Sequence, residues 1–107
     1  MKKRTIEELM NLNGRVYVYL DNEETAEQFF TQAEAEGFMF DDGERPTARH
    51  RDCIMALNKN RTIGYIGFVG HMAFGSGTGS VGSESLIRVD YRRYRSGEDF
   101  LYRKTTA

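Results

Sequence analysis

Residues 16–20 read Val16-Tyr17-Val18-Tyr19-Leu20, an uninterrupted run of β-branched, aromatic and aliphatic side chains. A strand that faces solvent on one side alternates apolar with polar residues, and this run does not. It therefore predicts a strand that is covered on both faces, and we place it in the middle of a sheet.

A helix is predicted on each side of this strand. Thr5-Ile6-Glu7-Glu8 fits a capping box, in which a hydroxyl and a carboxylate satisfy the free amides that open a helix, and Asn13-Gly14 would end it. Asp21 and Glu24 repeat the pattern before a second helix of about four turns, which Gly37 would close. The second helix has an apolar stripe formed by Ala26, Phe29, Phe30 and Ala33.

Acidic residues gather on and after the second predicted helix. No lysine or arginine lies between Arg15 and Arg45, against nine acidic residues. These carboxylates fit the cationic groove of a nucleic-acid-binding partner, and they equally fit a solvated helix flank. The candidate partner-binding residues of this acidic face are Glu23, Glu27, Glu34, Asp41 and Asp42.

The middle of the chain has the pattern of a hairpin. Residues 53–57 and 62–66 flank a short polar loop, and residues 38–40 predict a short strand or an extended segment before them. We expect the second arm to continue to Phe74 as a strongly curved strand, because glycine within a strand usually marks a bulge or a bend. Residues 75–85 are rich in glycine and serine and predict a mobile loop.

Residues 86–91 begin the last clear strand, within a segment rich in arginine and tyrosine. Continued strand alternation would put Arg88, Arg92 and Tyr94 on one face. Such a face suits phosphate contacts with base stacking, or the carboxylates of a partner protein. The alternative is that these arginines pair with the acidic helix or are simply solvated. The candidate binding residues are Arg88, Arg92, Tyr94 and Arg95.

Together these elements predict one α+β domain over residues 1–107. Two short helices would pack on a curved, mostly antiparallel sheet of four to five strands. A chain of 107 residues with 39% hydrophobic residues leaves little room for a second domain. A single cysteine excludes an internal disulfide, and no apolar run approaches the roughly 20 residues that span a bilayer. We therefore expect no membrane contact and a cytoplasmic location.

The net charge of −1 conceals an uneven distribution along the chain. Residues 1–44 hold eleven acidic and four basic side chains, whereas residues 45–107 hold five acidic and eleven basic ones. Opposite charges in the two halves, together with exposed strand edges, are compatible with a homodimer. The hypotheses for function therefore depend on two surfaces of opposite sign.

Signals for catalysis or for a cofactor are weak. Residues 77–82 match the letters of a dinucleotide-binding turn, but a strand follows where that turn needs a helix. His50, Cys53 and His71 invite a metal or nucleophile interpretation, yet no paired spacing supplies the remaining zinc ligands. We therefore expect no catalytic residues, no metal and no cofactor, with Cys53 and His71 as the only obvious candidates if the protein were an enzyme.

Three stretches of the chain resemble a known pattern. They are residues 26–30, residues 33–38 and residues 42–47, in which a short helix ends in a Gly-aromatic-x-aromatic step and a Gly-x-x-Pro turn comes next. This pattern is similar to that of small proteins from bacteriophages and integrated mobile elements of Gram-positive bacteria. Residues 62–65 and 70–74 look similar to the next part of the chain in some members.

The resemblance implies an origin more than a mechanism. Accessory proteins of such elements often inhibit host defence, as anti-CRISPR proteins do, and commonly act by binding. It therefore favours a non-catalytic inhibitor of a host defence protein or nucleoprotein complex. The near-zero net charge argues against plain DNA mimicry. The alternative function is a nucleic-acid or nucleotide-ligand binding module that uses the arginine and tyrosine face.

Overall fold

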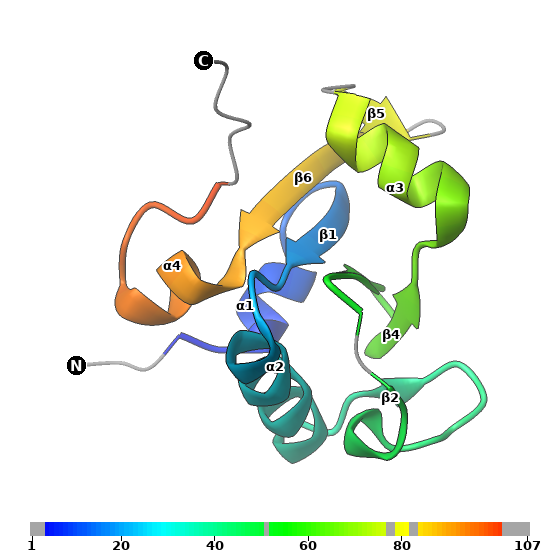
Figure 1. Ribbon diagram of the computed structural model, residues 1–107, viewed down its shortest axis with the longest axis vertical. Coiled ribbons are helices and arrows are strands. Elements are labelled where there is room, and N and C mark those ends of the chain that lie inside the picture. Colours follow the sequence, from blue (N-terminus) through cyan, green and yellow to red (C-terminus); the bar gives the residue numbers. More distant parts are fainter. Residues whose placement is uncertain (1–3, 51, 77–78, 82–83, 102–107) are drawn as a thin grey trace.

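The computed structural model describes residues 4–50, 52–76, 79–81 and 84–101 (Figure 1). The helices in these ranges are α1 (Ile6–Met10), α2 (Glu23–Ala35), the 3₁₀-helix η1 (Pro46–Ala48), α3 (Gly67–Ser76) and α4 (Tyr91–Ser96). The strands are β1 (Arg15–Tyr19), β2 (Met39–Phe40), β3 (Ile54–Leu57), β4 (Thr62–Tyr65), β5 (Ser80–Val81) and β6 (Glu84–Asp90). The expected α+β class is confirmed, with four α-helices described rather than two.

The strands form one open sheet in the order β2-β4-β3-β1-β6-β5. β1 lies inside it, between β3 and β6, so the prediction of a central strand is confirmed. β3 and β4 form the expected antiparallel hairpin. The sheet is mixed rather than mostly antiparallel, because β1 is parallel to β6 and β2 is parallel to β4. Long connections allow these parallel pairings.

Helices cover the two faces of the sheet unequally. α1, α2 and α4 pack on one face around a large core that includes Val16, Val18, Phe29 and Tyr91. The other face carries a smaller cluster, in which Phe74 of α3 packs with Tyr17, Ile54, Ala56 and Leu86. Figure 1 shows α3 apart from the other three α-helices. Because residues of β1 alternate between the two cores, every side chain of its apolar run has a buried environment to enter.

The prediction of a long curved strand after β4 is wrong, because the chain turns into α3 there. Gly67 adopts φ +67° where the helix begins, a conformation that glycine takes without strain. Phe74 then reaches the smaller core, and the Arg88 guanidinium donates to the carbonyl oxygens of Ala73 and Phe74 at 3.0 and 2.9 Å. The glycine signals therefore mark a helix start rather than a bulge.

The segment rich in glycine and serine, residues 75–85, is described only in part. Residues 77–78 and 82–83 lie outside the described ranges, and with them part of the predicted mobile loop. Between these gaps, β5 pairs antiparallel with the beginning of β6, and Ser80 lies opposite Ser85. The end of the predicted loop therefore belongs to the sheet.

The last strand is shorter at its far end than the sequence predicts. β6 stops at Asp90, whose carboxylate accepts a hydrogen bond from the Arg93 amide and caps α4. Gly97 closes α4 with φ +83°. Tyr91 and Tyr94 enter the large core from this helix. Beyond it, Leu101 forms an isolated antiparallel bridge with Val89.

The helix caps follow the predicted pattern only in part. Thr5 caps α1 as expected, but the carboxylate of Glu36 accepts from the Ile6 and Glu7 amides at 2.9 and 3.0 Å. The cap of α2 is Asn22 rather than Asp21. Glu36 therefore ties the end of α2 to the beginning of α1. Within the described ranges, no helix combines the length and the apolar character needed to cross a bilayer.

Candidate functional site

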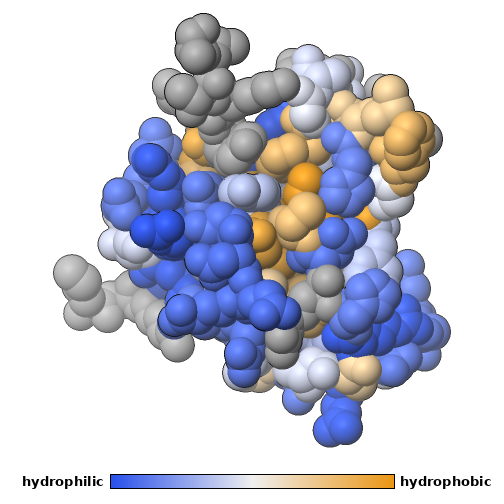
Figure 2. Space-filling view, in the orientation of Figure 1, coloured by the Kyte–Doolittle hydropathy of each residue, from blue (hydrophilic) through white to orange (hydrophobic). Residues whose placement is uncertain are grey.

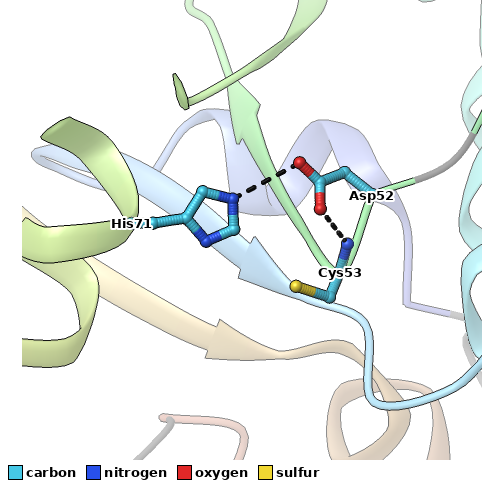
Figure 3. A group of neighbouring side chains, drawn as sticks. All are labelled: Asp52, Cys53 and His71. Carbon is cyan, nitrogen blue, oxygen red and sulfur yellow. Dashed lines mark hydrogen bonds and ion pairs between the residues drawn. The ribbon is translucent and has the colours of Figure 1, made fainter. Parts of the chain in front are cut away.

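Three side chains with different donor atoms meet at one end of β3. Asp52 and Cys53 directly precede this strand, and His71 lies on α3 (Figure 3). His71 Nε2 is 3.3 Å from Asp52 Oδ2, while Asp52 Oδ1 accepts from the Cys53 amide at 2.7 Å. The carboxylate, thiol and imidazole ligand atoms lie within 4.8 Å of one another. We call these three residues the Asp-Cys-His cluster.

The packing of α3 brings this cluster together. The carbonyl oxygen of Cys53 accepts from the Leu20 amide at 2.7 Å, which fixes the segment before β3 against the end of β1. Phe74 anchors α3 on the same face of the sheet, and His71 lies nearly one turn before it. Residues that are far apart in the sequence therefore become neighbours.

The pKa values of two residues in the cluster are shifted in opposite directions. Burial acts to raise the pKa of Asp52, but the bonds from the Cys53 amide and from His71 outweigh it and hold that pKa below its ordinary value. Burial, and then the negative charge of Asp52, raise the pKa of the Cys53 thiol. A thiol with a raised pKa is a poor nucleophile at neutral pH. The raised pKa of Cys53 therefore argues against a thiolate nucleophile at this position.

The sequence offers His50 as a candidate ligand beside Cys53 and His71, but the structure places His50 elsewhere. The His50 ring stacks on Tyr65, with centroids 4.8 Å apart, and it is not part of the cluster. Asp52 was not among the predicted candidates. Its position beside Cys53 was the only local signal, and no spacing rule connects that pair with His71.

The five predicted acidic residues do not share one environment. Glu23 and Glu27 are exposed on α2, and neither side chain has a hydrogen bond or ion pair within the described part of the chain. Glu34 accepts from the Thr47 hydroxyl at 2.6 Å, Asp42 is paired with Arg49, and Asp41 is exposed after β2. The structure therefore leaves Glu23 and Glu27 as the available pair on the helix.

The predicted basic strand face is wrong, because three of its four residues lie on α4. Tyr94 is only 3% exposed, and its hydroxyl donates to the Thr5 carbonyl oxygen at 2.6 Å, so its ring offers no stacking platform. Arg88 bonds the end of α3, and Arg92 is paired with Asp21 at 3.1 Å. Arg92 thus follows the alternative in which arginines pair within the molecule. Arg95 is exposed.

A shallow groove separates α2 from α4. Arg95 lies on one side of it, and Glu24 and Glu27 lie on the other with polar residues of α2. Figure 2 shows a hydrophilic surface over this part of the molecule and an apolar surface over α3. Phe68, which is 79% exposed, and Met72 belong to α3. The charged and apolar surfaces therefore lie over different helices.

Comparisons with protein-family models, with curated proteins and with solved structures found no match. The residues and their geometry therefore carry the case for function.

Proposed function

We propose that this protein is a non-catalytic binding protein that docks onto a cationic surface of a partner protein through the outer face of α2. The observation that carries the proposal is the exposure of Glu23, Glu24 and Glu27 without an ion pair in the described part of the chain. Other acidic residues, such as Asp21, Asp42 and Glu44, have arginine partners. Unpaired carboxylates on a rigid helix are free to meet arginines or lysines of a partner.

Helix electrostatics explains part of this acidic face but not all of it. Glu23 and Glu24 lie in the first turn of α2, where negative charge interacts favourably with the helix dipole. Glu27 lies a full turn further on, where that effect has faded. Its charge adds to a negative field that would speed association with a cationic partner.

The resemblance to proteins of bacteriophages and mobile elements suggests the partner. A nuclease complex of a host defence system, such as a CRISPR effector, keeps cationic grooves for nucleic acid, and an acidic helix face fits a groove of that charge. Inhibition would then result from occupation of the groove, with no bond made or broken.

The alternative function is nucleic-acid binding, and the candidate residues for it lie on α4 rather than on the predicted strand face. Arg92, Arg93 and Arg95 are exposed on this helix, although Arg92 and Arg93 each contact an aspartate. Exposed guanidinium groups can contact phosphates without base stacking. The buried ring of Tyr94 weighs against base recognition here.

Charge reversal separates the two candidate functions. The double variant Glu23→Lys/Glu27→Lys is expected to lose capture of a purified CRISPR effector complex and to restore defence in a phage-plating assay. The matched control Glu84→Lys/Glu98→Lys changes the same net charge on exposed residues away from α2 and should behave as wild type.

Two outcomes would contradict the proposal. One is equal capture by wild type and by the α2 double variant. The other is capture that disappears after nuclease treatment and in Arg92→Ala/Arg95→Ala, which would identify nucleic acid as the ligand of α4.

A further inference from the structure

We propose that Asp52, Cys53 and His71 form a binding site for a divalent metal ion of the zinc class. The three residues offer one oxygen, one sulfur and one nitrogen ligand from two separate elements. Zinc accepts all three donor types, whereas magnesium and calcium prefer oxygen alone. The mixed donor set therefore selects the class of metal.

The distances are compatible with tetrahedral ligation after a small adjustment. Zinc–oxygen and zinc–nitrogen bonds of about 2.0–2.1 Å place two ligands of one tetrahedral ion about 3.3 Å apart. The His71 Nε2 and Asp52 Oδ2 atoms are separated by 3.3 Å. All three ligand atoms lie within 4.8 Å of one another, and a zinc-bound sulfur lies about 3.5 Å from a nitrogen or oxygen ligand, so Sγ has to approach by roughly 1.3 Å at most. Cys53 is exposed, so a change of its side-chain rotamer meets little steric hindrance.

The surroundings of the cluster leave room for a fourth ligand of the metal ion, such as a water molecule. Asp52 and Cys53 line a hollow of about 210 Å³ together with Leu20, Asp21 and Ala26. The Oδ1 atom of Asp21 is buried and has no hydrogen-bond partner among the described residues. Three protein ligands leave the fourth position of a zinc ion to water. The hollow, which Asp52 and Cys53 line and His71 does not, offers space for such a water on the side of these two ligands.

The site would connect α3 to the sheet. Its ligands come from the segment before β3 and from the middle of α3, whose other contacts with the sheet include Phe74 and Arg88. A metal bond across this junction would hold the helix more firmly than packing on the smaller core alone. This role does not depend on the acidic face of α2 or on its proposed partner.

The test uses the untagged full chain, reduced and freed of metal with a chelator. Titration calorimetry with Zn²⁺ should show saturable binding of one ion per chain, and Co²⁺ should give the near-ultraviolet band of a thiolate–cobalt bond. Cys53→Ser and His71→Gln should each weaken Zn²⁺ binding by about 100-fold, and Cys53→Ser should also remove the cobalt band. Hydrogen exchange should slow in residues 67–76 when Zn²⁺ is added to wild type.

His50→Ala and Asp41→Asn are matched controls, since both residues are exposed and lie outside the cluster. They should bind Zn²⁺ as wild type does. Circular dichroism of the metal-free variants establishes that they are folded, and the exposure of Cys53 makes its serine variant the safest in this respect. The proposal is overturned if wild type shows no saturable binding at micromolar Zn²⁺, or if Cys53→Ser and His71→Gln bind it unchanged.

Discussion

The hydroxyl of Tyr94 connects the two ends of the described chain. It donates to the Thr5 carbonyl oxygen at 2.6 Å and lies 3.2 Å from a carboxylate oxygen of Glu8. Arg4 packs over the same ring, and Phe100 meets it edge-on with centroids 5.0 Å apart. Burial, followed by the charge of Glu8, raises the pKa of the phenol, so it remains a protonated donor through the neutral range.

Removing that hydroxyl should destabilise the fold without emptying the core. Tyr94→Phe keeps the ring but leaves the Thr5 carbonyl oxygen without this donor, and we expect a loss of about 1–2 kcal/mol in the free energy of unfolding. Urea denaturation measures it. Tyr17→Phe is the control, because the Tyr17 hydroxyl has no hydrogen bond within the described residues and its loss should change little. Equal effects of the two substitutions would contradict this assignment.

Glu34 provides a pH-dependent contact between α2 and η1. The Thr47 hydroxyl and then its amide donate to the carboxylate and lower the pKa of Glu34. Because the pKa of Glu34 is lower in the folded state than in the unfolded chain, the bonds from Thr47 contribute their full stability at pH values above the ordinary glutamate pKa. It disappears as the pH falls through the lower folded value.

Thr47→Val should raise the pKa of Glu34 towards its ordinary value, since it removes the hydroxyl and keeps the amide. The pH dependence of the Glu34 side-chain carbon signal in NMR measures the shift. Thr31→Val, on an exposed position of the same helix, is the control and should leave that pKa in place. A Glu34 pKa that is unchanged in Thr47→Val would show that the amide alone is responsible.

At the scale of elements, the junction of β1 and β6 depends on Gly14. This residue has φ +155°, and a Cβ atom built on it would lie 2.6 Å from the Ser85 carbonyl oxygen. Such a contact is closer than van der Waals packing allows, and the obstacle is backbone rather than a flexible side chain. The first residue of β1 pairs with Leu86 directly beyond it.

Gly14→Ala should therefore weaken this pairing by about 2 kcal/mol or more. Thermal unfolding of the variant measures the loss. Gly64→Ala is the matched control, because Gly64 lies in β4 with no positive φ and with no atom of the described residues within 4 Å of the added methyl group. Similar melting temperatures for Gly14→Ala and wild type would mean that β6 shifts without cost.

Elements with strong local signals were predictable, and elements decided by tertiary contacts were not. The apolar run of β1, the cap at Thr5 and the closing Gly37 each indicate their structure locally, and all three are confirmed. By contrast, glycines around Gly67 fit a bulge or a helix start equally well. The burial of Phe74 on the sheet decides between them, and no local pattern contains that contact.

The candidate site was predictable to the same limited extent. Cys53 and His71 have recognisable ligand chemistry, so the sequence alone indicates both as candidate ligands. The contact of His71 with Asp52 and Cys53 depends on where α3 packs, and the sequence predicts a strand in place of this helix. The exposed arginines of α4 were also predicted incorrectly. A strand period places them on one sheet face, but they lie on a helix, and helix and strand periods diverge within three residues.

At the scale of the whole molecule, the two cores differ in size and should differ in stability. The core under α1, α2 and α4 contains most of the large buried side chains, whereas α3 covers only a small cluster. Regions with few buried apolar contacts open at lower free energy than the rest of a domain. We therefore expect α3 to detach before the sheet unfolds.

Phe74→Ala should make this difference visible. Loss of the buried ring costs about 3 kcal/mol, which should speed hydrogen exchange in residues 67–76 while β1 and β3 stay protected. Mass spectrometry of exchanged peptides measures both regions. Phe68→Ala removes the same ring from a position that is 79% exposed on the same helix and should have little effect. Equal acceleration in α3 and β1 would mean that the molecule opens as a single unit.

The charge division of the chain is partly neutralised within the molecule. Arg92 pairs with Asp21, and Arg61 pairs with Glu7, each joining the basic half to the acidic half. Exposed pairs of this kind contribute little to stability individually. None of the ion pairs within the described ranges involves Glu23, Glu24 or Glu27 of α2, so these exposed charges are not neutralised by a direct partner.

The parallel pairing of β1 with β6 also bears on how the protein is made. A ribosome synthesises β1 well before its neighbour β6, which begins only at Glu84. Until that segment emerges, the nascent chain has an apolar strand with one open edge, which is prone to pair with other chains. Premature termination after β4 would leave this edge open permanently, and such fragments should depend on chaperones to stay out of aggregates.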